Sequence, residues 1–448
     1  MARALTSWWA DFLYISNHSD AMAARPPPQP EARSRTISTR HEDPLRESLL
    51  HHSRVFCMLP WVSLNVEPDG NVRTCCMTHA DIGNLRESTL AEIWNQEGMR
   101  RLRLDMLAGR ENPNCSQCYE LERSEVCSAR DVKKFINHFD LVKRTKPDGT
   151  VENLNLAFWD IKFSNLCNLR CRYCTPCRST SWHEEAVALG WIDPRVPALR
   201  TPTRNPAELW AQLEQALPSV EEIYFSGGEP LMAEEHYKVL KALIERRMFH
   251  VRLRYNTNFS VTRFRDDDVM RLWDRFEDVR VCASLDASGR RGEYIRKGLD
   301  WDQVVANRER MFEDCPRARF EIDAAITAMN VLHFPDFFED WVAKGFVDPA
   351  QPTGMPLRDP AEHRIQILPR HLKDAALERY ERMIERLESR HGREAVGGTV
   401  SRFRGMLQFM MARDMSDHLD QFREITRALD RSRGENFPEI FPELAGLF

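Results

Sequence analysis

The stretch that decides the fold is Cys167-Asn-Leu-Arg-Cys171-Arg-Tyr-Cys174, near the middle of the chain. Its three cysteines stand four and three residues apart, and cysteine thiolates are the usual ligands of iron–sulfur clusters. A [4Fe–4S] cluster takes four ligands, so a cluster held here would keep one iron without a local protein ligand. An open iron can bind a small molecule directly. The stretch therefore predicts a reactive cluster.

The same stretch resembles the CxxxCxxC signature of the radical SAM enzymes, including the aromatic Tyr173 before the last cysteine. In that family the open iron chelates the amino and carboxylate groups of S-adenosylmethionine (SAM). An electron from the cluster then cleaves the sulfonium and releases a 5′-deoxyadenosyl radical. The resemblance implies that Cys167, Cys171 and Cys174 hold the cluster and that Tyr173 lies beside the cofactor.

The composition is that of an ordinary globular protein of two or three domains. The chain has 448 residues and a formal net charge of −5, which gives no long-range attraction to nucleic acid or to an anionic membrane. No run approaches the ~20 apolar residues that a membrane helix needs. The cysteines are clustered and no secretory signal is evident, so we expect metal ligation in a reducing cytoplasm.

The chain divides into five predicted segments. Residues 1–52 are proline-rich around Pro26–Pro30 and predict a flexible arm. A small α+β cluster domain is expected over 53–130 and a linker over 131–152. A barrel domain follows over 153–371, and a helical extension over 372–448.

Four cysteines in the second segment, Cys57, Cys75, Cys115 and Cys118, bracket a predicted hairpin (61–66 and 71–75) and a predicted helix (90–107). Four cysteines with a CxxC pair also suit a structural zinc ion. The spacing, with Gly70 five residues before Cys75, resembles the SPASM and twitch domains, which hold auxiliary [4Fe–4S] clusters. The resemblance implies one such cluster here, although this module usually follows the catalytic barrel and here precedes it.

Six strand-like runs alternate with helical stretches in the fourth segment, which indicates parallel strands with right-handed crossovers. The predicted strands cover 154–163, 222–225, 251–255, 279–285, 320–327 and 364–368. The predicted helices cover 206–217, 234–247, 266–276, 301–312 and 335–342. This α/β pattern fits the partial (β/α)6 barrel of radical SAM proteins, in which reactive groups lie at the carboxyl ends of the strands.

Further motifs stand at those strand ends. The second strand runs into Ser226-Gly-Gly-Glu-Pro230, and paired glycines allow a close backbone approach. In the family this motif binds the methionyl amino group, which implies Glu229 and the backbone of Gly227 and Gly228 here. At the fourth strand the resemblance implies Ser284, and more weakly Asp286, as cofactor ligands.

An arginine is also expected in the cofactor site. Arg296 stands twelve residues after Ser284, where SPASM-containing relatives place an arginine on the methionyl carboxylate. A guanidinium suits that group because it donates two parallel hydrogen bonds, but an ordinary surface arginine is an equal alternative. Asn256 and Asn258 either line the substrate side or cap the third strand.

The other cysteines have weaker assignments. Cys177 follows Cys174 with CxxC spacing and is a candidate hydrogen-atom donor, with simple packing as the alternative. Cys127 is a second donor candidate. Cys76 lies beside the assigned ligand Cys75, and the spacing favours Cys75 as the ligand.

The resulting hypothesis is a radical SAM enzyme with two [4Fe–4S] clusters and SAM. It would be reduced by a flavodoxin or ferredoxin-type donor and would abstract hydrogen from an unactivated C–H bond. Relatives with such modules act mostly on peptides, so the resemblance implies oxidation, cross-linking or epimerisation of a peptide or peptide-like natural product. A sugar or aminocyclitol is the alternative substrate. A non-catalytic Fe–S or zinc scaffold is the alternative of another class, and the Gly227–Pro230 motif argues against it.

Overall fold

The computed structural model describes residues 43–78, 80–123, 130 and 134–448. Most of the predicted arm (1–42) and Cys127 lie outside the described residues. Residues 44–52, which the composition assigns to the arm, form helix α2 (Pro44–Glu47) and a π-helical turn (Ser48–His52). Leu49 and Leu50 of this turn are buried, so these residues pack with the folded chain.

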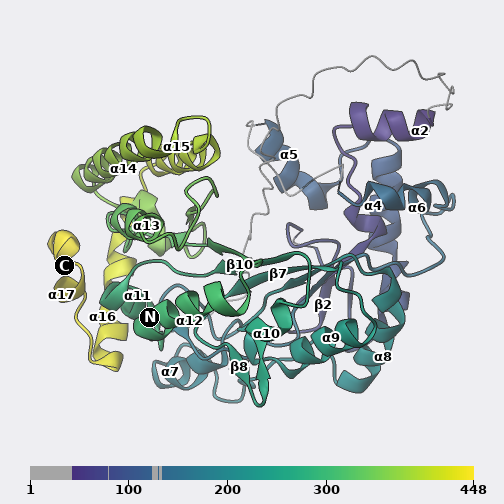
Figure 1. The fold of residues 1–448 in the computed structure, drawn as a ribbon, viewed down its shortest axis with the longest axis horizontal. Helices are drawn as coiled ribbons and strands as arrows, with labels where there is room; N and C mark the ends of the chain where they lie inside the picture. The colour runs from purple at the N-terminus through teal and green to yellow at the C-terminus, as the bar shows by residue number, and fades with distance from the viewer. Residues whose placement is uncertain (1–42, 79, 124–129, 131–133) are drawn as a thin grey trace.

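An eight-stranded sheet forms the centre of the molecule, in the order β12-β10-β7-β6-β4-β1-β2-β3 (Figure 1). Strands β12 to β1 in that order are parallel, and β2 and β3 continue the sheet with antiparallel pairing. The strands are β1 (Ser63–Val66), β2 (Asn71–Arg73), β3 (Gly83–Asn84), β4 (Phe158–Ile161), β6 (Glu222–Phe225), β7 (Arg252–Thr257), β10 (Val279–Ala283) and β12 (Arg319–Ile322). Every residue of β1, β4 and β6 is buried, as expected for strands covered on both faces.

The crossover helices confirm the predicted βα alternation. They are α8 (Pro206–Ala216), α9 (Glu234–Glu245), α10 (Val269–Trp273), α12 (Trp301–Asp314) and α13 (Phe334–Ala343). Capping fixes several of their starts: the side chain of Asn205 accepts the backbone N–H of Glu208, and that of Asp300 accepts the N–H of Gln303. Figure 1 shows α8, α9, α10 and α12 along one side of the sheet.

Five of the six strand predictions in this segment are confirmed, and the sixth, over 364–368, is wrong. Those residues form two 3₁₀ turns, Ala361–His363 and Ile365–Ile367. Their alternating apolar pattern is satisfied by burial without a neighbouring strand: Ile367 bonds back to Arg364, and the carbonyl of Gln366 accepts the N–H of Met415. A short parallel pair, β13 (Ala325–Ile326) with β14 (Met355–Pro356), precedes these turns in the chain.

The N-terminal cluster region is joined to the barrel region through the sheet itself. The predicted hairpin is present as β1 and β2, and β1 pairs in parallel with β4, from Ser63 opposite Phe158 to Val66 opposite Ile161. The predicted single helix over 90–107 is two helices, α3 (Leu90–Trp94) and α4 (Glu97–Leu107). The break falls at Asn95, whose side chain bonds both backbone groups of Val151.

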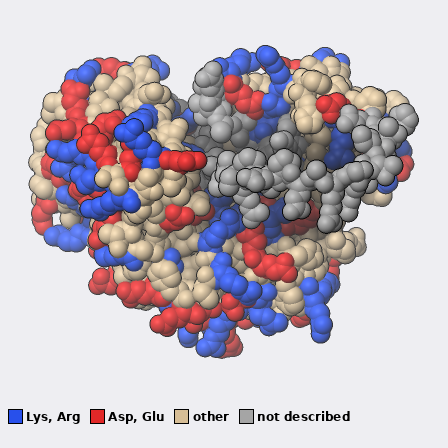
Figure 2. Space-filling view, turned by 45° about the horizontal axis from the view of Figure 1, so that its top comes forward, with Lys and Arg blue, Asp and Glu red and all other residues tan. Residues whose placement is uncertain are grey.

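The C-terminal region is helical, as predicted. It contains α14 (Arg370–His391), α15 (Gly397–Met411), α16 (Leu419–Arg433), α17 (Phe437–Ile440) and a 3₁₀ segment (Pro442–Leu447). In the part of the chain that the structure describes, no helix has the length and apolar character to cross a membrane. On the face shown in Figure 2, acidic and basic side chains are interspersed.

Candidate active site

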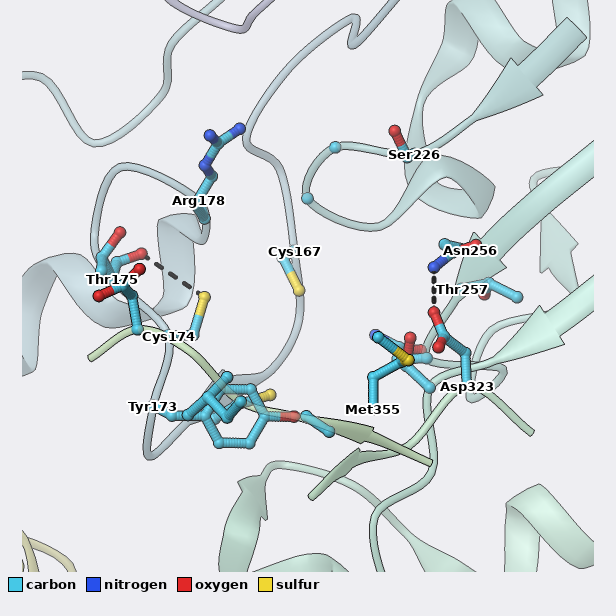
Figure 3. A pocket seen from close by; sticks show the side chains of 18 of the residues that line it. Cys167, Tyr173, Cys174, Thr175, Arg178, Ser226, Asn256, Thr257, Asp323 and Met355 are labelled. Carbon is cyan, nitrogen blue, oxygen red and sulfur yellow. Dashed lines mark hydrogen bonds between the residues drawn. The ribbon is translucent and has the colours of Figure 1, made fainter. Parts of the chain in front are cut away.

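A cavity opens at the carboxyl ends of the parallel strands, where this architecture places reactive groups. Its barrel-side lining comes from the cysteine loop and from the ends of β6, β7, β10 and β12. These lining residues include Cys167, Leu169, Cys171, Tyr173, Cys174, Ser226, Gly227, Gly228, Asn256, Thr257, Asn258, Ser284, Arg296 and Asp323. The structure thus brings most of the predicted cofactor residues to one place. Figure 3 shows Cys167 and Cys174 on one side of this cavity and the Asn256–Asp323 pair on the other.

Hydrogen bonds to the backbone of the cysteine loop hold it in place. Strand β5 (Arg170–Cys171) pairs antiparallel with β11 (Arg296–Lys297), so that Cys171 lies opposite Arg296. The Ser181 hydroxyl donates to the carbonyl of Cys167 at 2.7 Å, and the Trp182 indole donates to that of Cys171 at 3.0 Å. These contacts place the three cysteines along the rim of one space.

The three thiols fit a bound cluster. Burial raises the pKa of Cys174 to about 12 and raises the pKa values of Cys167 and Cys171 as well. Cysteine binds metal as the thiolate, and ligation couples binding to loss of the thiol proton. The positive charge of bound iron would therefore stabilise the thiolate forms of these three buried cysteines.

Three predicted residues form a connected group behind Cys171. Arg296 Nη2 donates to Asp286 Oδ1 at 2.9 Å, and its Nε lies 2.9 Å from Asp286 Oδ2. The Tyr173 hydroxyl donates to Asp286 Oδ2 at 2.6 Å. Arg296 Nη1 lies 3.8 Å from the sulfur of Cys171. Arg296 is 6% exposed and lines the cavity, so it is not an ordinary surface arginine, while Asp286 is fully buried beneath it.

The paired glycines are required by the cysteine loop. A Cβ on Gly228 would lie 2.2 Å from the carbonyl oxygen of Leu166, and Gly227 has a φ of +127°. The N–H of Glu229 donates to that same Leu166 carbonyl at 2.6 Å. The glycine turn therefore lies directly against the chain that leads into Cys167.

Glu229 connects this turn to β7. Its carboxylate accepts the Thr257 hydroxyl at 2.6 Å and the N–H of Asn258 at 2.7 Å. Burial raises its pKa to about 7, and these hydrogen bonds act in the opposite direction. Among the described residues, Gly227 and Gly228 line the cavity and Glu229 lies behind them.

A second cavity is lined by the four cysteines of the N-terminal region, Cys57, Cys75, Cys115 and Cys118, together with Arg130. Cys57 precedes the turn before β1, and Cys75 follows β2. Cys115 ends the 3₁₀ turn Pro113–Cys115, and Cys118 lies in the first turn of α5 (Ser116–Arg123). Burial raises the pKa of Cys57 to about 12 and that of Cys115 to about 11. The four thiols line one space, as the ligands of a single bound group would.

Comparison with known proteins identifies two domains in this chain. A model of the radical SAM superfamily matches residues 161–332, and an iron–sulfur cluster-binding domain, SPASM, matches residues 57–119. The chain thus contains a radical SAM domain. Its SPASM domain precedes the radical SAM domain, as the cysteine order predicts. No curated protein matches the sequence.

Two solved structures resemble this radical SAM chain distantly. Streptococcus suis SuiB bound to S-adenosylmethionine shares 15% identity over 67% of this chain and 63% of that chain, with a TM-score of 0.36. Native anSMEcpe with bound AdoMet shares 18% identity over 50% of this chain and 60% of that chain, with a TM-score of 0.32. The radical SAM chain thus spans less than two thirds of either protein.

The SPASM region contributes residues to the radical SAM cavity, which the sequence did not indicate. Glu67, Cys76, Met77 and Gln117 line it together with Lys162 of the barrel. Lys162 Nζ lies 3.0 Å from Glu67 Oε1, which joins the two regions at the cavity wall. Cys177, the predicted candidate hydrogen donor, is a described residue outside this lining. Apart from the three predicted cluster ligands, the cysteine that lines this cavity among the described residues is Cys76.

Asp323 is a further cavity residue that the motif search did not single out. It follows β12, and Asn256 Nδ2 donates to its Oδ2 at 2.5 Å. Burial raises its pKa. An acidic residue directly after the fifth strand is the signal that could have identified it. Asn256 and Asn258, for which two interpretations were open, both line the cavity.

Proposed function

We propose that this protein cleaves SAM reductively and abstracts a hydrogen atom from an unactivated C–H bond of a peptide or peptide-like natural product. Oxidation or cross-linking would complete the reaction. The observation that carries the proposal is the shared cavity. Three cysteines, the glycine turn and Arg296 line one part of it, and SPASM-region residues line another.

Each proposed iron–sulfur cluster has its own set of cysteine ligands in this chain. Cys167, Cys171 and Cys174 would hold the SAM-binding [4Fe–4S] cluster, and Cys57, Cys75, Cys115 and Cys118 the auxiliary one. When bound, these groups would supply a 5′-deoxyadenosyl radical and a one-electron acceptor. A reduced flavodoxin or ferredoxin-type protein would supply the electron for cleavage.

The residues of the radical SAM domain would orient the cofactor. Arg296 would face the methionyl carboxylate, and its pairing with Asp286 fixes the direction of the guanidinium. Gly227 and Gly228 present backbone at the cavity for the methionyl amino group, and Glu229 supports that turn from behind. Ser284 and Tyr173 complete the proposed cofactor contacts from β10 and from the cysteine loop.

Asp323 supports the oxidative outcome. After a substrate carbon has lost a hydrogen atom, a two-electron oxidation must also remove one electron and one proton. Asp323 lies in the cavity, and burial raises its pKa, which makes its carboxylate a stronger base than an exposed one. The electron would pass to the auxiliary cluster, the one-electron acceptor of this proposal.

Cys76 supports epimerisation as a second candidate outcome. Its thiol lines the cavity, so it could return a hydrogen atom to the opposite face of a substrate radical. The thiyl radical formed on Cys76 would then need one electron and one proton, with the electron drawn from the same donor protein. Oxidation removes two hydrogen atoms from the substrate, whereas epimerisation leaves its mass unchanged.

The experiment is anaerobic turnover of the reconstituted full-length chain with SAM and a reductant. Candidate substrates are peptides and sugars encoded or made by the neighbouring genes. We expect 5′-deoxyadenosine from the wild type and none from the Cys167→Ala, Cys171→Ala, Cys174→Ala triple variant. Mass spectrometry in D₂O then distinguishes a product lacking two hydrogens from one that has gained a single deuterium. A wild type that releases no 5′-deoxyadenosine refutes the proposal.

A further inference from the structure

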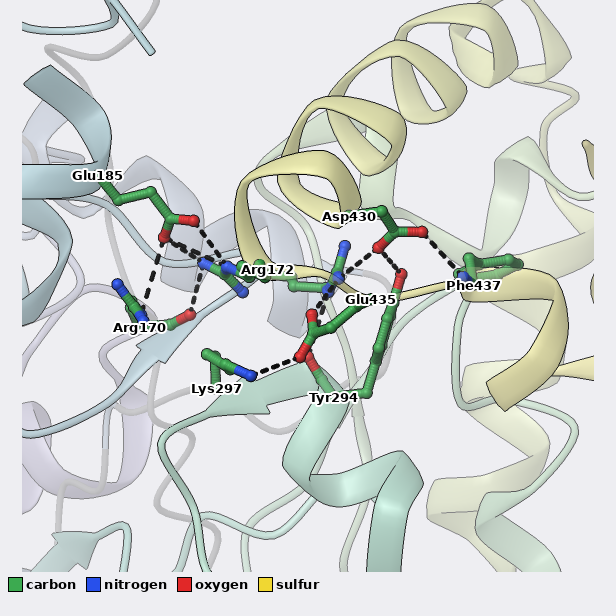
Figure 4. Close-up of polar contacts among 9 residues, drawn as sticks. Arg170, Arg172, Glu185, Tyr294, Lys297, Asp430, Glu435 and Phe437 are labelled. Atoms are coloured by element: carbon green, nitrogen blue, oxygen red, sulfur yellow. Dashed lines mark hydrogen bonds and ion pairs between the residues drawn. The ribbon is translucent and has the colours of Figure 1, made fainter. Parts of the chain in front are cut away.

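Two arginines stand between the cluster cysteines, and both are tied to the C-terminal helical region. Arg170 and Arg172 flank Cys171, yet neither lines the cavity among the described residues. The side chain of Arg172 is 1% exposed, so its charge needs partners within the protein. Figure 4 shows that these partners come largely from α16 and the turn that follows it.

Arg172 is surrounded by acceptors. Its Nη2 lies 2.6 Å from Asp430 Oδ1 and 2.6 Å from Glu435 Oε2, and its Nε donates to the carbonyl of Tyr294 at 3.1 Å. The guanidinium carbon lies 3.5 Å from the centre of the Tyr294 ring. The Tyr294 hydroxyl donates to Asp430 Oδ1, and Lys297 pairs with Glu435. Asp430 and Glu435 therefore fix the position of Arg172.

A second contact holds the other side of the loop. Arg433, the last residue of α16, forms a bidentate pair with Glu185 in which the side chains are 1% and 3% exposed. Its Nη2 also donates to the carbonyl of Arg170 at 3.1 Å. The guanidinium lies over the ring of Trp182, 4.9 Å from its centre, and the indole of Trp182 donates to the carbonyl of Cys171. Arg433 thus connects α16 directly to the carbonyl of Arg170 and, through Trp182, to the carbonyl of the cluster ligand Cys171.

These contacts join parts of the chain about 250 residues apart in sequence. Burial makes each charged group depend on its partner, because an unpaired charge at these positions would be strongly disfavoured. The loop that carries Cys171 is therefore held by groups that, among the described residues, lie outside the cavity lining.

We propose that α16 and its following turn, residues 419–435, are a positioning element for the SAM-cluster loop and that Arg172–Asp430 and Arg433–Glu185 are its two anchors. The C-terminal region is then required for retention of the SAM cluster and for its redox potential. The inference concerns the cluster that Cys167, Cys171 and Cys174 hold in the proposed function.

The test compares Asp430→Asn with Asp420→Asn in the full-length protein. Both substitutions remove one carboxylate from α16, but Asp420 is 92% exposed and pairs only with Arg423 among the described residues. We expect Asp430→Asn to lose iron selectively from the SAM site while it retains the auxiliary cluster. The midpoint potential of its remaining SAM cluster should also shift. Asp420→Asn should match the wild type in both respects.

Arg433→Lys separates positioning from general misfolding. It keeps the positive charge but cannot form the bidentate pair with Glu185. In the metal-free protein, Cys171 should react several-fold faster with an alkylating reagent in Asp430→Asn and in Arg433→Lys than in Asp420→Asn. Equal alkylation rates and equal iron retention across the variants would overturn the inference. A wild type without iron would refute the proposed function instead, and the alkylation comparison would still test the anchors.

Discussion

Cys75 and Cys76 are adjacent in the sequence and line two different cavities. Cys75 faces the space shared with Cys57, Cys115 and Cys118, whereas Cys76 faces the cavity that Cys167 lines. The two residues lie in the bend and turn that follow β2, where the N–H of Thr78 donates to the carbonyl of Cys75 at 3.2 Å. One dipeptide therefore connects the auxiliary site to the proposed substrate site.

Single substitutions should separate these two cysteines. Cys75→Ala should lower the iron content by about four per chain, the size of one [4Fe–4S] cluster. Cys76→Ala should keep the full iron content and release 5′-deoxyadenosine, but it should abolish deuterium incorporation if the product is an epimer. Cys177→Ala is the matched control and should leave turnover unchanged. Loss of a cluster in Cys76→Ala would reverse the ligand assignment.

Gly228 should be intolerant of any side chain. A Cβ there would lie 2.2 Å from the carbonyl of Leu166, so Gly228→Ala should lower the free energy of unfolding by about 1–3 kcal/mol and displace the cysteine loop. The control is Gly405→Ala in α15, where an added Cβ meets nothing within 4 Å. That substitution should raise the free energy of unfolding by roughly 0.5–1 kcal/mol. Urea unfolding measures both, and equal effects would contradict the packing described here.

Glu229 should make the stability of the metal-free protein depend on pH. Burial raises its pKa from 4.5 to about 7, so the folded state binds a proton that the unfolded state releases between these values. The free energy of unfolding should then fall as pH rises from about 4.5 to 7, by up to ~3 kcal/mol, and change little above that. Glu229→Gln should remove this part of the dependence. Parallel pH profiles for the two proteins would show that Glu229 does not titrate in this range.

Asp323→Asn should allow SAM cleavage but slow the formation of an oxidised product. Removal of a general base typically costs 10²-fold or more, so product should fall by about 100-fold while 5′-deoxyadenosine is still released. Because burial raises the pKa of Asp323, product formation by the wild type should increase with pH as the carboxylate ionises. Product and 5′-deoxyadenosine quantified in the same reactions give the ratio. An unchanged ratio in Asp323→Asn would exclude this residue as the base.

The local parts of this structure could be predicted from the sequence. Cys167–Cys174, the turn at Gly227–Gly228 and the buried strands are each encoded within a few residues, and their patterns carry a physical reason. The strand predicted over 364–368 failed because alternating apolar residues require only burial, which 3₁₀ turns against the C-terminal helices also provide.

The long-range parts could not be predicted in this way. Nothing in the local sequence indicates that β1 pairs with β4, and that pairing brings Cys76 to the radical SAM cavity. The contact between Glu185 and Arg433 joins positions 248 residues apart, where both side chains resemble ordinary surface charges in the sequence. Asp323 likewise became a candidate only when the strand ends were placed around one cavity.

The most direct test of the account is the metal and sulfide content of the anaerobically purified full-length protein. Two [4Fe–4S] clusters predict about eight irons and about eight sulfides per chain, with about four of each remaining when Cys167, Cys171 and Cys174 are all replaced by alanine. Stoichiometric zinc, with neither iron nor sulfide, would contradict the account.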